Sequence, residues 1–184
     1  AYLKCHYPNE FMAALLTSVL DNTDKVIEYS GECQRLGIKV LPPNINVSDG
    51  GFTVDGSDIR FGLNAVKNVG RNLIAAVVRE RKEKPFRSLY DFCRRMYGCE
   101  INRRAVESLI KCGAFDGLAA TRRAMLQCIE GILKSVETDS RKNLEGQLDL
   151  FSQSGEQETV NDYAIPSLEE FPTGELLQME KEVS

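Results

Sequence analysis

Histidine and closely spaced cysteines are scarce in this sequence, which narrows the chemistry open to it. His6 is the single histidine, and no Ser, Cys or Asp stands at a spacing that would make it part of a catalytic set. The six cysteines include no C-x-x-C pair, so the usual zinc-site spacing is missing. A glycine-rich P-loop is missing as well. We therefore expect no catalytic residues, no metal site and no cofactor in this chain.

Long apolar runs and a secretory signal are also missing. No apolar run is longer than residues 11–16, far short of the roughly 20 residues that span a bilayer. Residues 1–5 show no signal-peptide pattern, and the lack of a start methionine indicates a piece of a longer chain. Disulfides are not expected in such a chain. We interpret the cysteines as free thiols and expect a cytoplasmic protein without membrane contact.

The charge, in contrast, is unevenly distributed along the chain. The formal net charge is -4, but residues 59–134 hold 16 Lys/Arg and 7 Asp/Glu, net +9. Residues 1–58 are net -4 and residues 135–184 are net -9. A basic block attracts polyanions, because contacts with phosphates release counterions. Two alternatives remain open: a solvated basic helix face, and a helical scaffold whose basic block docks on an acidic protein.

The residue pattern predicts a mainly helical fold with a small β-hairpin insert. Apolar residues spaced by four predict a helix over 9–20, and those spaced by three and four predict another over 23–36. Asn22 is placed to cap the second helix and Gly37 to end it. Residues 38–62 read as a short β region whose Asp55-Gly56 dipeptide suits a tight hairpin turn.

Within the basic block, residues 62–78 have the pattern of a helix-hairpin-helix. A short helix is expected to end at Lys67, a tight turn to follow, and a second helix to start near Arg71. Val69 would point back between the helices, and Gly70 would let a phosphate approach the backbone. The unpaired amides of the second helix would then form an anion site. An ordinary helical hairpin is the alternative interpretation.

Residues 109–126 repeat this scheme, with a glycine turn after Lys111 and a following helix that contains Arg122 and Arg123. Two hairpins in tandem fit a unit that grips both strands of a duplex without reading bases. The residues predicted to contact DNA are Lys67, Asn68, Val69, Gly70, Arg71, Asn102, Arg103, Arg104, Lys111, Gly113, Arg122 and Arg123.

The acidic tail contains a short apolar motif. Its composition predicts a flexible acidic C-terminal tail, because it offers little to bury. Leu148, Leu150 and Phe151 would fill a groove on a partner while Gln147 hydrogen-bonds, as short linear peptides do. The alternative is a turn that folds back on the domain. The predicted peptide consists of Gln147, Leu148, Asp149, Leu150 and Phe151.

Several of these segments resemble the end of the fingers region of bacterial replicative DNA polymerase III alpha subunits. The similar segments are residues 1–4, 7–8, 10–17, 22–25, 37–43, 59–63 and 109–116. Residues 147–151 look like the family's internal sliding-clamp-binding motif, and residues 176–182 like the approach to its oligonucleotide-binding domain. Cys112 stands where the family usually has alanine, and residues 153–165 match nothing in the pattern.

The resemblance implies a fragment with a defined place in a replicase. It implies distal fingers helices and the β-insert at 1–58, tandem hairpins that hold duplex DNA at 59–134, a flexible linker at 135–175 with the clamp peptide at 147–151, and the next domain from 176. The implied partners are duplex DNA, the sliding clamp and other holoenzyme subunits. The family adds deoxynucleotides with two Mg ions held by palm aspartates. No match to that palm motif is present, so the fragment is expected to be inactive.

Overall fold

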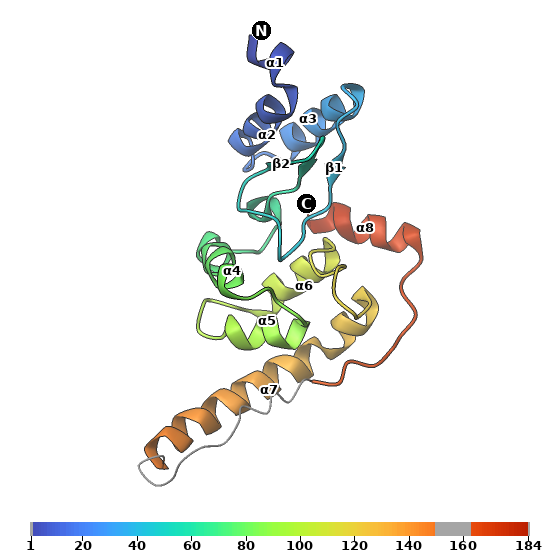
Figure 1. Ribbon diagram of the computed structural model, residues 1–184. Coiled ribbons are helices and arrows are strands. Elements are labelled where there is room, and N and C mark those ends of the chain that lie inside the picture. The colour runs from blue at the N-terminus through green and yellow to red at the C-terminus, as the bar shows by residue number, and fades with distance from the viewer. Residues whose placement is uncertain (1, 150–162, 184) are drawn as a thin grey trace.

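The computed structural model describes residues 2–149 and 163–183, with only the helical backbone considered over 142–149. The described part is mainly helical and includes one small sheet, as the sequence predicts (Figure 1). Its elements are α1 (Tyr2–His6), α2 (Pro8–Ser18), α3 (Thr23–Arg35), β1 (Val40–Leu41), β2 (Thr53–Asp55), β3 (Asp58–Arg60), the 3-10 turn η1 (Leu63–Ala65), α4 (Arg71–Glu83), α5 (Leu89–Arg95), α6 (Arg103–Lys111), α7 (Arg122–Asp149) and α8 (Thr173–Val183).

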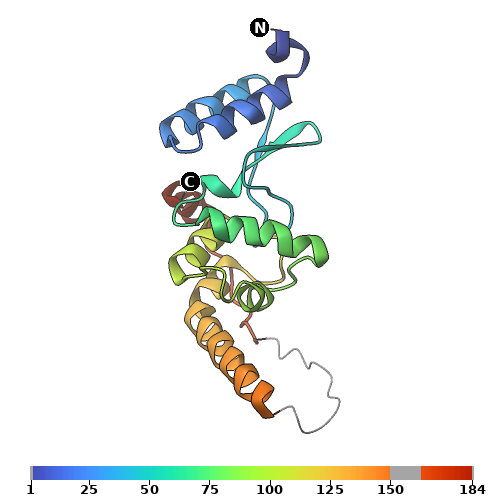
Figure 2. The same cartoon turned by 90° about the vertical axis from the view of Figure 1, so that its left-hand side faces the viewer.

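Helices α2 and α3 lie together at one end of the molecule with the sheet beneath them (Figures 1 and 2). The Asn22 side chain accepts a hydrogen bond from the Lys25 amide at 3.1 Å and caps α3, as predicted. Gly37 follows the helix with φ 77°, a conformation that glycine adopts without steric cost. Met12, Leu16 and Cys33 are buried where these helices meet the sheet. This small core is separate from the one beneath the basic block.

The sheet has three strands in the order β1-β3-β2. Strands β2 and β3 form the expected hairpin, but Asp55 pairs with Asp58, so the two turn residues are Gly56 and Ser57. The turn therefore lies one residue later than the sequence prediction. Gly56 has φ 64° at the first turn position, where a primed turn requires a positive φ. β1 runs parallel to β3, with Val40 opposite Ile59, and this pairing joins the sheet to α3.

The larger core lies among α4, α5, α6 and α7. Phe86, Phe92 and Phe115 are fully buried and meet edge to face, with ring centroids 5.2 and 5.1 Å apart. Arg95 lies over the Phe86 ring and donates to the Glu80 and Lys84 carbonyls at the end of α4. The basic block is thus a packed helical body, and the phenylalanines belong to its core.

Helix α7 is longer than the sequence indicated. It runs from Arg122 to Asp149 without a break, so the boundary expected at residue 134 falls inside a helix (Figure 1). Ile129, Ile132 and Val136 are buried in the core, and this apolar stripe carries the helix past the predicted linker start at residue 135. The helix then projects from the body (Figure 2).

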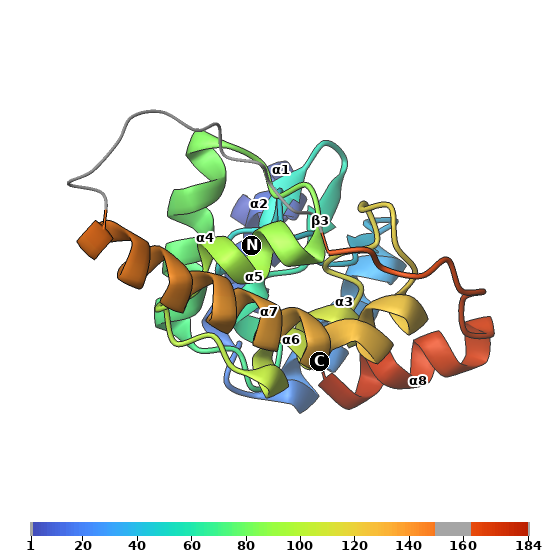
Figure 3. The ribbon, with the colours of Figure 1, turned by 90° about the horizontal axis from the view of Figure 1, so that it is seen from below.

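Residues 163–183 return along the body and end against it (Figures 1 and 3). The Tyr163 ring stacks on Tyr90 at 6.4 Å and rests on Gly131, where a Cβ would collide with the Tyr163 hydroxyl. Tyr90 in turn donates to Asp139 at 2.6 Å. At the other end of the segment, Val183 is 4% exposed within the large core. The C-terminal part of the described chain is therefore anchored at both ends.

Candidate nucleic-acid interface

The first turn of the basic block lies between η1 and α4. The helix expected to end at Lys67 is a single 3-10 turn that ends at Ala65, because Val66 is extended and its side chain is buried. Asn68 takes φ 64°, a conformation that asparagine tolerates better than most residues. Its side chain donates to the Ser108 hydroxyl at 3.2 Å. The first turn is thereby held against α6, and Val69 packs on the core as predicted.

Gly70 is the N-cap of α4 and leaves the start of that helix open. It has φ -70°, and a Cβ built there would meet no atom within 4 Å. Neither backbone conformation nor internal packing therefore requires glycine here. No side chain caps the helix, so its first amides remain available to an external acceptor. Arg71 is 74% exposed, and its 3.2 Å pair with the still more exposed Asp21 is a weak constraint.

The second turn follows α6 and is built differently. The Gly113 amide donates to Ile110 and the Ala114 amide to Leu109, which closes the helix in a Schellman motif. Gly113 has φ 84°, and a Cβ there would lie 2.8 Å from the Asp116 carboxylate and collide with the Arg122 guanidinium. Gly113 is itself buried. Gly113 is therefore needed for the turn conformation and for the packing under Arg122. The prediction that it contacts a phosphate does not fit its buried position.

Arg122 also departs from its predicted role. Its side chain is 5% exposed and donates to Asp116 at 2.5 Å, to the Lys111 carbonyl at 3.0 Å and to Glu180 at 2.8 Å. The hydrogen bonds to Asp116 hold the pKa of the guanidinium above its ordinary value. Arg122 therefore ties the second turn, α7 and α8 together. Its guanidinium is directed into the protein rather than toward a ligand.

The first amides of α7 bind an anion that the chain itself supplies. The Glu170 carboxylate accepts from the Arg122 amide at 2.8 Å and from the Arg123 amide at 3.2 Å. It also accepts from the Phe171 amide at 3.0 Å. Burial raises the pKa of Glu170, but the three amide donors outweigh it and hold the pKa below its ordinary value. The N-terminus of α7, in the second hairpin, thus binds a carboxylate of the same chain.

Lys67 and Lys111, one from each turn, meet at the end of α8. The Lys67 amide donates to the Val183 carbonyl at 2.8 Å, and the Lys67 ammonium to the Glu182 carbonyl at 3.3 Å. The Lys111 ammonium pairs with the Glu182 carboxylate at 3.1 Å. The structure therefore brings the two predicted turns together around the end of α8, through backbone carbonyls at Lys67 and one carboxylate at Lys111.

The remaining predicted contacts are more scattered. Asn102 caps α6 by accepting from the Ala105 amide at 2.9 Å. Arg103 pairs with Glu107 and Glu130, whereas Arg104 is exposed and forms no ion pair within the described part. Arg123 is exposed and lies 5.7 Å over the Phe171 ring. Within the basic block, the prediction omitted five exposed cations that form no ion pair among the described residues: Lys82, Lys84, Arg87, Arg94 and Lys134. Their sequence signal was only the net charge of the block.

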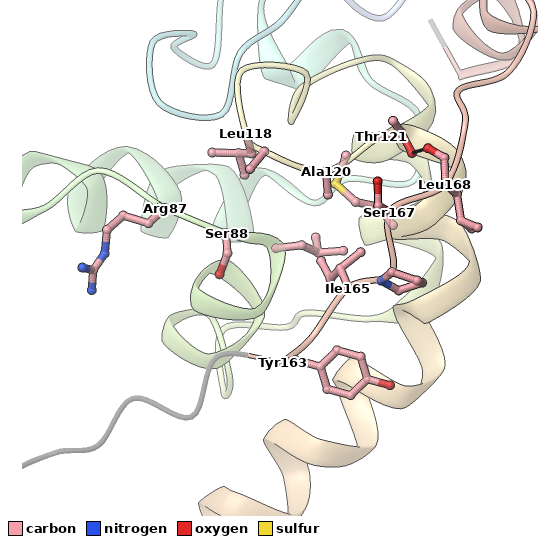
Figure 4. A pocket seen from close by; sticks show the side chains of 13 residues that line it. Arg87, Ser88, Leu118, Ala120, Thr121, Tyr163, Ile165, Ser167 and Leu168 are labelled. Carbon is pink, nitrogen blue, oxygen red and sulfur yellow. Dashed lines mark hydrogen bonds between the residues drawn. The ribbon is translucent and has the colours of Figure 1, made fainter.

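A cavity of about 240 Å³ lies where the C-terminal segment crosses the start of α5 (Figure 4). Leu118, Met125 and Ile165 supply apolar lining, and Arg87 points away from the other labelled side chains. Among the described residues, no three His, Cys, Asp or Glu side chains are grouped as a metal site. The uncapped helix start and the lysines described above lie at the two turns, which we take as the candidate interface.

The profile of the helix-hairpin-helix motif matches residues 37–125, which include the sheet, both turns and the start of α7. The whole chain is also similar to known proteins. DNA polymerase III subunit alpha of Saccharopolyspora erythraea is 43% identical over 189 residues, 100% of this chain. The subunits of Bacillus subtilis and Escherichia coli are 39% and 38% identical over 99% and 98% of it. This chain is homologous to a segment of DNA polymerase III subunit alpha.

The homologous segment is a small part of DNA polymerase III subunit alpha: the chain spans 16% of the length of each of these three relatives. The resemblance expected from the sequence is thereby confirmed. Of the predicted clamp peptide, Gln147, Leu148 and Asp149 form the last residues of α7, and Leu150 and Phe151 lie outside the described residues. Within the described residues, no helix is both long and apolar enough to cross a membrane.

Proposed function

We propose that this chain binds the sugar–phosphate backbone of duplex DNA as one segment of a replicative DNA polymerase. The homology to DNA polymerase III subunit alpha and the helix-hairpin-helix match support this proposal. Both hairpin turns lie in the basic block and approach each other through the Asn68–Ser108 hydrogen bond. Backbone contacts of this kind position a protein on DNA without reading its sequence.

The open start of α4 is the observation that best supports DNA binding. Gly70 has no internal reason to be glycine, and the amides that follow it are uncapped and carry partial positive charge. A residue without a side chain at an uncapped helix start allows an anion to reach the backbone. Lys67 and Arg71 flank this position and are exposed. A phosphate oxygen would therefore find amide donors and cations at one place.

Fluorescence anisotropy with unrelated duplexes tests the proposal. We expect weak binding that does not depend on sequence and that falls as salt increases. Lys67→Ala and Arg71→Ala should each weaken binding, and each lost phosphate contact should flatten the log K versus log[salt] slope by about 0.9. An unchanged slope in both variants would contradict the assignment of the first turn.

A scaffold that docks on an acidic protein is the second candidate. The specific observation in its favour is that the second turn already holds two carboxylates, Glu170 at the start of α7 and Glu182 at Lys111. This candidate predicts no duplex binding even at low salt. The same anisotropy measurement therefore separates the two functions.

We further propose that residues 147–151 bind the sliding clamp. The support is their resemblance to the family's clamp motif and the position of residues 147–149 at the far end of α7. The double substitution Gln147→Ala and Phe151→Ala should abolish co-migration with the clamp in gel filtration while duplex affinity stays unchanged. Clamp binding that survives the double substitution would exclude this peptide as the contact.

For the whole protein we propose DNA-directed addition of deoxynucleotides, the activity for which its relatives are named. Two Mg ions in the palm of the parent protein would supply the metal chemistry. No step of that chemistry is assigned to the residues of this chain. Primer extension by the chain alone should therefore be absent, and any extension by the purified chain would overturn this assignment. We also place the chain among the subunits of a replicative holoenzyme in the cytoplasm.

A further inference from the structure

The described residues 163–183, here called the acidic strap, run along the body (Figures 1 and 3) and contact both hairpin turns at Lys67 and Lys111. The strap contains five glutamates and one lysine, so its formal net charge is about -4. Most of its side chains are exposed, and Val183 is the one buried side chain that the structure describes in it. The strap therefore lies on the surface of the body and contributes little to its core.

The strap places oxygen acceptors at five donors of the turns, three backbone amides and two lysine ammonium groups. The Glu170 carboxylate accepts hydrogen bonds from the first amides of α7, and the Glu182 carboxylate forms an ion pair with the Lys111 ammonium. The carbonyls of Glu182 and Val183 accept from Lys67. These carbonyls form the end of α8, where the partial charge of a helix is negative.

Negative oxygens at a helix start and at paired lysines are what a DNA phosphate would present to the same donors. A donor that already holds a carboxylate cannot hold a phosphate oxygen at the same time. By contrast, the α4 amides after Gly70 are uncapped and no strap contact reaches them. The strap thus covers one part of the interface and leaves the other open.

We propose that the acidic strap is an internal substitute for DNA phosphates, which must leave the second turn and Lys67 before duplex DNA can engage both turns. This inference rests on the proposed DNA binding and deepens it. The apparent affinity of a partly covered site falls by the fraction of molecules in the open state. The strap would therefore weaken non-specific duplex binding and make full engagement depend on its release.

Two substitution pairs with equal charge change test the strap. In the full chain, Glu170→Ala with Glu182→Ala removes two contacting carboxylates. The control pair, Glu169→Ala with Glu175→Ala, removes two exposed strap carboxylates for which no contact is described. We expect the contact pair to bind a generic duplex about tenfold more tightly than wild type, and the control pair to change Kd by about twofold or less. Equal tightening in both pairs, or none in the contact pair, would overturn the inference.

The salt dependence gives a second readout from the same titrations. In wild type, DNA binding has to break the Lys111–Glu182 pair, which becomes easier as salt rises. The contact pair should therefore show a log K versus log[salt] slope steeper than wild type by about 0.9. Identical slopes would contradict the competition.

Hydrogen exchange of the wild-type chain tests displacement without any substitution. Saturating duplex should increase exchange of amides in residues 163–183, while the Arg122 and Arg123 amides stay protected because phosphate replaces Glu170. Bound duplex with an unchanged or more protected strap would overturn this inference and leave the proposed function intact. Failure of wild type and both variant pairs to bind duplex would overturn the proposed function together with it.

Discussion

The two hairpin turns differ in what their glycines do. Gly70 lies in an ordinary extended conformation with open space around it, whereas Gly113 has φ 84° and lies beneath the Arg122 guanidinium. The first turn faces solvent, and its cations are exposed. The second turn is sealed by Arg122, which reaches Asp116 and α8. Similar sequence patterns, a lysine followed closely by a glycine, thus build an open, uncapped helix start in one case and a buried packing contact in the other.

The largest difference should appear when an arginine is removed from each turn. Arg122→Ala leaves the Asp116 and Glu180 carboxylates without their shared partner, and we expect a loss of about 3 kcal/mol in the free energy of unfolding. This is near the lower end of such losses because both carboxylates are partly exposed. Arg71→Ala, at an exposed pair, should change it by about 0.5 kcal/mol or less. Urea denaturation measures the free energy of unfolding of both variants. Similar losses in the two would contradict the conclusion that only the second turn depends on its arginine for stability.

Serine at each glycine makes the same comparison for the backbone. Gly113→Ser forces a side chain into a left-handed conformation and against Asp116, which should cost about 2 kcal/mol. Gly70→Ser adds a good capping residue in open space and should change stability by about 0.5 kcal/mol or less. Thermal unfolding of the two variants measures this. A strongly destabilised Gly70→Ser would show that the first turn also needs glycine for folding.

A bulkier substitution at Gly70 should act on DNA affinity more than on stability. Gly70→Val leaves the free protein folded but holds a phosphate away from the α4 amides, so we expect Kd to rise about tenfold, or about 1.4 kcal/mol. Gly31→Val in α3 is the matched control, because a Cβ at Gly31 also meets nothing within 4 Å. Fluorescence anisotropy at fixed salt measures the Kd of both variants. Wild-type affinity in both would contradict the proposal that a phosphate approaches the α4 amides at Gly70.

The smallest expected effect is a pH dependence at the second turn. The pKa of Glu170 lies below its ordinary 4.5, since its amide donors outweigh its burial. A lowered folded-state pKa means that the contact stabilises fully above about pH 4.5 and is lost as pH falls through the lower folded value. NMR titration of the Arg122 and Arg123 amide protons should show this transition. In Glu170→Gln the transition should vanish, and its persistence would assign it to another group.

Local features of the fold were accessible from the sequence, because they depend on neighbouring residues. Asn22 caps α3 and Gly37 ends it as expected, and the β-hairpin is present although its turn is shifted by one residue. The homology of the chain was visible in its motifs. These features depend on capping, turn geometry and apolar spacing, which are written within a few positions of each other.

The contacts of the site residues were much harder to predict from the sequence. Arg122 looked like any exposed basic residue because its partner Glu180 stands 58 positions away. The use of α7 amides by Glu170, 48 positions away, gave no local signal either. The composition of the acidic tail predicts a flexible segment with little to bury, yet ion pairs with the basic block hold part of it in place. Contacts between distant segments depend on tertiary structure, which a pattern of nearby residues does not encode.

Because α7 is unbroken, it fixes the distance between the second turn and residue 147 near the far end of the helix. At about 1.5 Å per residue, the helix places residue 147 roughly 40 Å from its start beside the second turn. An unstructured tether would allow many separations between residue 147 and the body. A helix anchored in the core by Ile129, Ile132 and Val136 acts instead as a rigid spacer. Whatever binds at its tip is therefore held at a set spacing and direction from the body.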